Sequence, residues 1–190
     1  MGRIVVTEFI SLDGVIEDPG GAEDYKYGGG SFEFNRGEEG DKFKLDELME
    51  AEAQLFGRVT YEGFAKAWPS RSDEVGFADR INSMPKYVVS STLTNPEWSP
   101  TTVLNGDLAD DVSKLKEDVG GGILVAGSAQ LAQALIEHNL VDQLNLMVFP
   151  VVLGDGKRLF GPVSDKKRFK LADAKQVGTD GVSVLTYQAA

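Results

Sequence analysis

The sequence predicts an α/β fold with a mostly parallel central sheet, helices on both of its faces and an antiparallel hairpin at the C-terminal edge. Apolar strand segments alternate with amphipathic helical segments over most of the chain, which is typical of parallel sheets. The last two segments alternate apolar and polar residues around Gly178-Thr179-Asp180-Gly181, which indicates a hairpin. The 190 residues are expected to form one domain over 1–190, large enough for a full hydrophobic core.

The first strand is expected at residues 4–10, where Thr7 and Glu8 interrupt a β-branched and apolar run. Residues 17–40 contain seven glycines and one proline, so they are expected to form a long loop without regular structure. Long loops in compact domains often cover functional sites. This loop also carries four aromatic residues, so we expect it to pack on the body of the protein as a lid: Tyr25, Tyr27, Phe32 and Phe34.

The remaining elements follow from apolar spacing and from residues that break or cap regular structure. Asp41 is a candidate cap for the first helix, Trp68-Pro69 ends the second, and Asn139 is a candidate C-terminal cap for the last. Helices are expected at residues 41–52, 59–67, 73–83, 108–119 and 129–138. Further strands are expected at residues 55–56, 86–91, 101–104, 123–126, 144–153, 169–176 and 182–188.

Composition excludes several function classes. The formal net charge is −11, and a surface this acidic repels nucleic acids and anionic lipids. The absence of cysteine excludes disulfides, thiolate catalysis and zinc–thiolate sites. His138 is the only histidine and no acidic cluster stands out, so no metal site is expected. The N-terminal residues show no signal-peptide pattern, and no apolar run is long enough to cross a membrane, so a cytoplasmic location is expected.

Two turns point to a phosphate-bearing ligand. Residues 54–61 and 123–128 each run from an apolar strand into a glycine and then into a helix start. Such turns expose backbone N–H groups and a helix N-terminus, which attract phosphate, so the pair predicts a pyrophosphate of a dinucleotide. The alternative for residues 54–61 is an ordinary turn with a surface arginine. The alternative for residues 123–128 is tight packing at Gly127 with Ser128 as a helix N-cap.

With these turns the chain resembles the dihydrofolate reductase-like superfamily, and most closely the branch that contains the reductase domain of the bifunctional riboflavin-biosynthesis deaminase-reductase. The segments that carry the resemblance follow one another in the family's order and span nearly the whole chain. They are Ser11-Leu12-Asp13-Gly14, Leu55-Phe56-Gly57-Arg58-Val59-Thr60-Tyr61, Tyr87-Val88-Val89-Ser90-Ser91-Thr92, Ile123-Leu124-Val125-Ala126-Gly127-Ser128, Val141-Asp142-Gln143-Leu144 and Phe149-Pro150-Val151-Val152-Leu153-Gly154.

The resemblance implies an NADPH-dependent reductase that transfers hydride to a C=N or C=O carbon of a small polar heterocycle or sugar-like compound. Arg58 would face the adenosine 2′-phosphate or the pyrophosphate, which suits a planar cation with several donors. The cofactor-binding residues that carry over are Gly57, Arg58 and Thr60 at the first turn, Ser90 and Ser91 on the adenosine side, and Gly127 and Ser128 at the second turn.

Two acidic residues are candidates for catalysis. Asp13 follows the first strand beside the expected crevice, although Asp-Gly also favours tight turns. Asp41 lies at about the spacing of the helical acid of dihydrofolate reductases, and its alternative role is the helix cap. Two departures count against riboflavin-pathway activity: Ala126 replaces the glutamate that usually precedes the second glycine, and Val15 replaces the lysine that usually follows Ser-Leu-Asp-Gly.

Two other functions stay open at this point. The chain is alternatively a non-catalytic, dimeric nucleotide-binding protein of the same fold, or a flavoprotein. A homodimer is expected from the resemblance and from the apolar strand at residues 144–153, which is a candidate for pairing across a two-fold axis.

Overall fold

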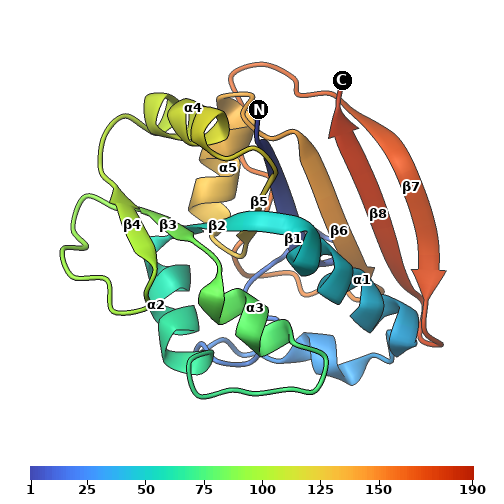
Figure 1. Cartoon of the computed structure of the whole chain (residues 1–190). Coiled ribbons are helices and arrows are strands. Elements are labelled where there is room, and N and C mark those ends of the chain that lie inside the picture. The colour runs from blue at the N-terminus through green and yellow to red at the C-terminus, as the bar shows by residue number, and fades with distance from the viewer.

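The computed structural model describes all 190 residues and contains one eight-stranded sheet (Figure 1). The strand order is β4-β3-β2-β5-β1-β6-β8-β7. All neighbours from β4 to β6 are parallel, and the last two pairings, β6 with β8 and β8 with β7, are antiparallel. The predicted fold class is therefore confirmed. The strands are β1 (Arg3–Ser11), β2 (Ala51–Gly57), β3 (Lys86–Val89), β4 (Thr101–Leu104), β5 (Gly122–Ala126), β6 (Gln143–Phe149), β7 (Phe169–Val177) and β8 (Val182–Ala189).

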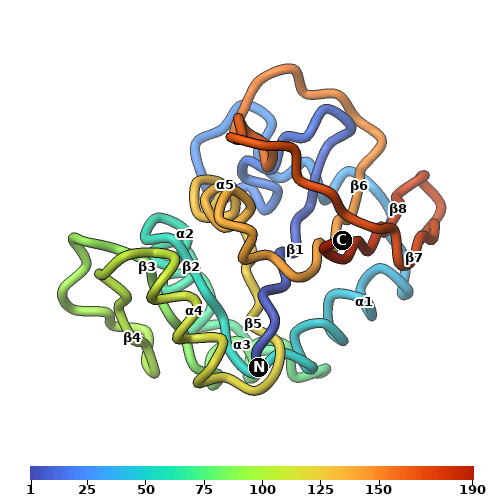
Figure 2. The backbone as a smooth tube through the Cα atoms, turned by 90° about the horizontal axis from the view of Figure 1, so that it is seen from above, coloured from blue at the N-terminus to red at the C-terminus, as the bar shows by residue number.

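Helices cover both faces of the parallel part of the sheet (Figures 1 and 2). Helices α4 (Leu108–Asp118) and α5 (Ala129–Glu137) pack on one face through residues such as Val112 and Leu135. Helices α1 (Gly37–Glu50), α2 (Arg58–Ala67) and α3 (Phe77–Ser83) pack on the other face through residues such as Leu48, Tyr61 and Ile81. No helix is long and apolar enough to cross a membrane.

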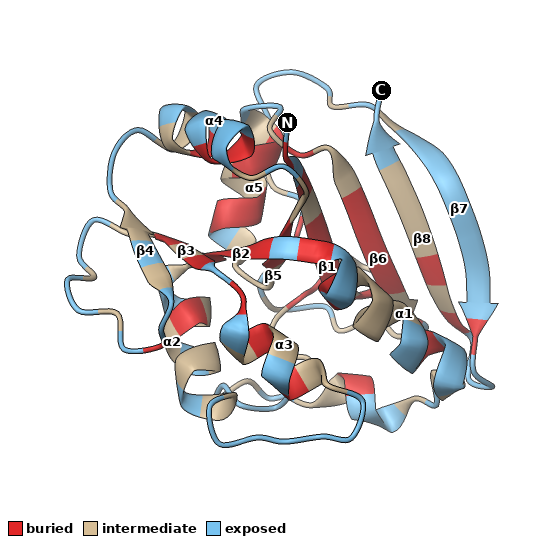
Figure 3. Ribbon diagram, in the orientation of Figure 1, coloured by how far each residue is buried: buried red, intermediate tan, exposed pale blue.

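The central strands are buried on both faces, as Figure 3 shows for β1, β2 and β6. Ile4 and Val6 of β1 belong to the 18-residue cluster beneath α4 and α5. A separate apolar cluster surrounds Phe149 where the C-terminal hairpin meets β6. Each fully buried side chain of this size stabilises the fold by about 1.5–3 kcal/mol. The sheet is therefore rigid at its centre, and that rigidity positions the turns at its ends.

Helix α1 begins four residues earlier than predicted. It starts at Gly37, with Arg36 at the N-cap position, so the expectation that Asp41 caps this helix is wrong. The start is set by contacts with the distant β7–β8 turn: the backbone N–H of Asn35 donates to an Asp180 carboxylate oxygen at 2.6 Å. Gly37 adopts a left-handed conformation with φ 64°, which glycine reaches without strain.

Further boundaries differ from the prediction. Strand β2, expected only at residues 55–56, begins at Ala51, so the end of the helix expected at residues 41–52 belongs to this strand. Helix α3 starts at Phe77 instead of residue 73. The Asp73 carboxylate accepts hydrogen bonds from the N–H groups of Phe77 and Ala78, the first two residues of the helix, so Asp73 itself lies before the helix. Strand β6 ends at Phe149 instead of residue 153, because Pro150 has no N–H to continue the ladder.

The position of β6 rules out the predicted pairing across a two-fold axis. β6 lies between β1 and β8, so both of its hydrogen-bonding edges are occupied within the chain. The homodimer therefore rests on the family resemblance alone.

Candidate functional site

The predicted site residues gather at one edge of the sheet. Because β1, β2, β3 and β5 are parallel, their carboxyl ends lie side by side, and Gly57 at the end of β2 is in register with Val89 at the end of β3. Ser90 and Gly127 follow directly after β3 and β5, and Asp13 lies two residues after the end of β1. Ligands of α/β proteins bind at this edge, where the strand order reverses.

The two glycine turns are bonded to each other. The Gly57 N–H donates to the Ser128 hydroxyl at 2.9 Å, and the Ser128 N–H donates to the Thr60 hydroxyl at 3.0 Å. A Cβ atom at Gly127 would come within 3.0 Å of the Thr60 methyl carbon, and Gly127 has a φ of 64°, so glycine is required there. The sequence prediction that these turns converge is confirmed by this geometry.

The helices that follow these turns have N-termini without side-chain caps. No side chain caps α2 or α5, although Ser128 stands at the N-cap position of α5. The interpretation of Ser128 as a capping serine is therefore wrong, because its hydroxyl bonds to Gly57 of the other turn. The first N–H groups of both helices remain available to a ligand, and helix N-termini favour anions.

Arg58 opens helix α2 next to these N–H groups. Its side chain is 44% exposed and pairs with Glu62 one turn later at 2.9 Å. A guanidinium has five N–H donors, so this contact leaves several of them free. Ser90 begins the turn after β3, where its hydroxyl accepts from the N–H groups of Thr92 and Leu93, and its neighbour Ser91 is exposed.

Asp13 holds the end of β1 against the loop after β6. Its carboxylate accepts hydrogen bonds from the Ser11 hydroxyl at 2.6 Å and from the N–H groups of Leu153 at 3.1 Å and Gly154 at 2.8 Å. These bonds, led by the one from Ser11, lower the pKa of Asp13 from 3.8 to about 2. A carboxylate that stays ionised to such acidic pH is unsuited to donate a proton, so the role that this geometry fits is positioning.

Asp41 lies in the second turn of α1 and faces solvent. Its side chain is 66% exposed and pairs with Arg36 at 2.6 Å. The catalytic role of Asp41 stays a prediction. The buried acid of this helix is Glu47, whose side chain is only 7% exposed.

Glu47 belongs to a polar network between α1 and the sheet that sequence reasoning missed. Its two carboxylate oxygens accept from Thr7 of β1 at 2.8 Å and from Asn145 of β6 at 3.0 Å. Lys44 pairs with Glu47, donates to Thr7 at 2.7 Å and lies 4.9 Å from the ring centre of Phe9. Two features of the sequence could have predicted this network. Lys44 and Glu47 are three residues apart beside the apolar stripe of the predicted helix, and Thr7 is a polar residue within a predicted buried strand.

A second buried acid lies beside the Gly127 turn. Glu8 of β1 is 3% exposed, and one of its oxygens accepts from the Gly127 N–H at 3.2 Å. Its other oxygen, Oε1, has no hydrogen-bond partner. Burial raises the pKa of Glu8 well above its usual range, which favours the protonated form. An acid within an otherwise apolar central strand was the sequence signal for this group.

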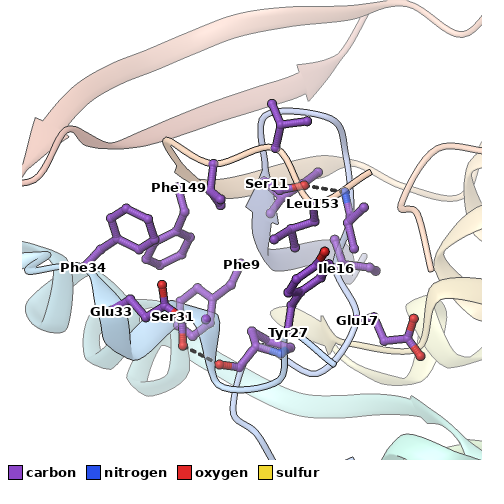
Figure 4. A pocket seen from close by; sticks show the side chains of 16 residues that line it. Phe9, Ser11, Ile16, Glu17, Tyr27, Ser31, Glu33, Phe34, Phe149 and Leu153 are labelled. Atoms are coloured by element: carbon purple, nitrogen blue, oxygen red, sulfur yellow. Dashed lines mark hydrogen bonds between the residues drawn. The ribbon is translucent and has the colours of Figure 1, made fainter. Parts of the chain in front are cut away.

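A cavity of about 220 Å³ lies at the carboxyl ends of β1 and β6, beneath the loop at residues 17–40 (Figure 4). The loop packs on the body as predicted through Tyr25 and Phe34, but Phe32 is 77% exposed. The loop is also not without regular structure, because Gly30–Glu33 form a 3-10 helix, η1. The Tyr25 hydroxyl donates to the Asp155 carbonyl at 2.6 Å, and the Ser31 hydroxyl donates to the Pro19 carbonyl at 2.6 Å. β1 separates this cavity from the β5 turn, and neighbouring strands lie about 4.8 Å apart. The Gly127 N–H donates to Glu8, the chain neighbour of the cavity-lining Phe9, but no residue of either glycine turn lines the cavity itself.

Comparison with known families matches residues 3–183 to the RibD C-terminal domain. The chain belongs to this family. The RibD C-terminal domain is a reductase domain, so membership supports a reductase-type activity. Among curated proteins, YyaP of Bacillus subtilis is 28% identical over 186 residues and YwjB of the same species is 27% identical over 169 residues. The alignments cover 96% of this chain and 93% of YyaP, and 89% of this chain and 88% of YwjB. The functions of both relatives are uncharacterised.

Solved structures of the RibD family share the fold. A Shewanella sp. PV-4 protein, assigned provisionally to riboflavin biosynthesis, matches with a TM-score of 0.76 and 23% identity, covering 99% of each chain. Acinetobacter baumannii RibD matches with a TM-score of 0.67 and 16% identity, and the match covers all of this chain but 58% of that one. A Thermotoga maritima diaminohydroxyphosphoribosylaminopyrimidine deaminase/5-amino-6-(5-phosphoribosylamino)uracil reductase matches with a TM-score of 0.63 and 15% identity, over 57% of its chain. At these identities the likeness establishes the fold.

Proposed function

We propose that this protein is an NADPH-dependent reductase that transfers hydride to a small molecule bound in the cavity beneath the loop at residues 17–40. The observation that carries the proposal is the pair of hydrogen bonds that join the Gly57 and Ser128 turns. They bring two uncapped helix N-termini and Arg58 to one place, which is what a pyrophosphate needs in a protein of net charge −11. Membership of a reductase family supports the same conclusion.

Each part of the site has a role in this proposal. Arg58 and the N–H groups of α2 and α5 hold the phosphates, and Ser90 and Ser91 contact the adenosine side. NADPH, when bound, supplies the hydride. The protein orients the acceptor carbon in the cavity, and the loop at residues 17–40 excludes water from it.

Calorimetry with a matched pair of variants tests the cofactor assignment. Arg58→Ala removes the guanidinium, and we expect it to weaken NADPH binding by about 10- to 100-fold and NADH binding less, because charge-assisted bonds to phosphate contribute about 1.5–3 kcal/mol. Glu62→Gln is the control, since it keeps Arg58 and removes only its pairing partner. NADPH should bind this control at least as tightly as it binds the unmodified protein. Absence of any heat with NADPH would refute the assignment.

The alternative of a non-catalytic nucleotide-binding protein predicts a different result. Absorbance at 340 nm, followed with a panel of pyrimidines, pterins and aldehydes, should fall with at least one member of the panel if the protein is a reductase. Tight NADPH binding without oxidation by any of them would favour the non-catalytic alternative.

We also propose that the protein forms a homodimer in the cytoplasm, on the strength of the family resemblance. Because β6 is internal, the dimer must use a surface other than the edge of that strand. Sedimentation equilibrium that shows only monomer would refute the dimer.

A further inference from the structure

The cavity at the ends of β1 and β6 has an aromatic wall (Figure 4). Phe149 is its centre: the Phe9 ring packs edge-on against it with centroids 5.6 Å apart, and the Phe34 ring lies 5.7 Å from it. Tyr27 lines the cavity from the loop. Aromatic side chains in offset or edge-on packing present faces and edges on which a planar ring can pack.

The charges on the cavity wall are negative. Glu17 and Glu33 are the acidic residues among its lining residues, and no lysine or arginine lines it. Nearby cations are engaged elsewhere. Lys157 is shared by Glu17 at 3.8 Å and Glu23 at 3.7 Å. Arg158 pairs with Asp13, and Arg36, which lies over the Phe9 ring, pairs with Asp41.

A phosphate in this cavity would therefore approach Glu33, which forms no ion pair, and Glu17, which shares the single cation Lys157 with Glu23. Groups of like charge a few ångströms apart repel one another, and the cost is largest where water is partly excluded. The net charge of −11 adds to this repulsion. A neutral ring avoids the penalty, and a cationic ring gains from the carboxylates.

The size of the cavity limits the ligand further. Pockets that hold drug-sized ligands have volumes of about 300–1,000 Å³. The volume here is about 220 Å³, which suits a molecule of one or two rings. The Thermotoga relative, by contrast, is named as a reductase of a phosphoribosylamino-uracil.

We propose that the substrate of this site is a one- or two-ring aromatic molecule that is neutral or positively charged and carries no phosphate. This inference rests on the reductase function proposed above and narrows its substrate class, because it excludes sugar phosphates. The aromatic wall supplies the affinity, and Glu17 and Glu33 supply the selection against anions.

Three fluorescent probes of one shape and different charge test the proposal: 2-naphthol, 2-naphthylmethylamine and 2-naphthyl phosphate. Each is titrated with the full-length protein and followed by fluorescence anisotropy. We expect the neutral and cationic probes to bind at least about 10-fold more tightly than the phosphate. Glu33→Lys should reduce that preference at least about threefold by strengthening the phosphate probe.

Glu117→Lys is the matched control, because it makes the same change in net charge at an exposed position of α4, beside the amino end of β1 and away from the cavity. Three results would overturn the proposal: tighter or equal binding of the phosphate probe, equal effects of Glu33→Lys and Glu117→Lys, or no binding of any probe at about 1 mM. NADPH binding is measured separately on the same protein. If the protein does not bind NADPH, the reductase function is refuted, but the relative affinities of the three probes are unaffected. The failure of one proposal is therefore distinguishable from the failure of the other.

Discussion

The hydrogen bonds between the Gly57 and Ser128 turns lead to a quantitative prediction for the variant Ser128→Ala. The change removes the acceptor of the Gly57 N–H and leaves that partly buried donor unsatisfied, while the second bond, from the Ser128 N–H to Thr60, survives. An unsatisfied buried donor costs about 1–3 kcal/mol, and partial exposure places this site in the lower half of that range. With a urea dependence of about 2 kcal/mol per molar, the unfolding midpoint should fall by about 0.5–1 M.

The same variant should weaken NADPH binding, because one of the two hydrogen bonds that hold the helix N-termini together is lost. Urea unfolding followed by circular dichroism and calorimetry with NADPH measure the two effects. Ser113→Ala, at an exposed position of α4, is the control and should alter neither quantity. Refutation would come from a Ser128→Ala protein with an unchanged midpoint, or from one that is destabilised as expected but binds NADPH with unaltered affinity.

Three further predictions concern the loop and two titrating groups. Gly28→Ala should lower turnover more than NADPH affinity, because a Cβ there would come within 2.3 Å of an Asp18 carboxylate oxygen, whereas Gly20→Ala has open space and should be neutral in steady-state kinetics. Lys86 is 1% exposed and burial lowers its pKa from 10.5 to about 8. The unfolded chain therefore binds more protons between these values, and the free energy of unfolding should rise by about 3 kcal/mol from pH 8 to 10.5. Urea midpoints across this range should show no such rise in Lys86→Met. The lowered pKa of Asp13 contributes stability that is present above pH 3.8 and lost as pH falls towards 2. The stability of Asp13→Asn, measured by acid unfolding, should therefore fall less between pH 3.8 and 2 than that of the unmodified protein.

Local patterns were sufficient to predict the turns of the site. A strand that runs into a glycine and then into a helix is a short-range signal, and the signals at Gly57 and Gly127 both marked real strand–helix turns. Parallel strands then place such turns at one edge without further information. The hydrogen bonds between them depend on the adjacency of β2 and β5, which are separated by about 70 residues in the chain.

Features set by distant contacts were missed. The start of α1 depends on Asn35 and Asp180, so the local sequence gave no reason to begin the helix at Gly37. This shift matters for the acids of the helix: Asp41 faces solvent and Glu47 faces the sheet. The position of β6 inside the sheet was also not predictable, because an apolar run of residues does not distinguish a central strand from an edge strand.

The outermost strand has a consequence for the behaviour of the protein at high concentration. β7 presents an almost fully exposed face, a register shift between Leu171 and Asp173, and charged side chains at Lys170 and Lys175. Irregular strand pairing and lysine side chains keep an edge strand from pairing with strands of other molecules and forming fibrils. Crowded solutions of this protein should therefore remain free of cross-β aggregates, even though one flank of its sheet is uncovered.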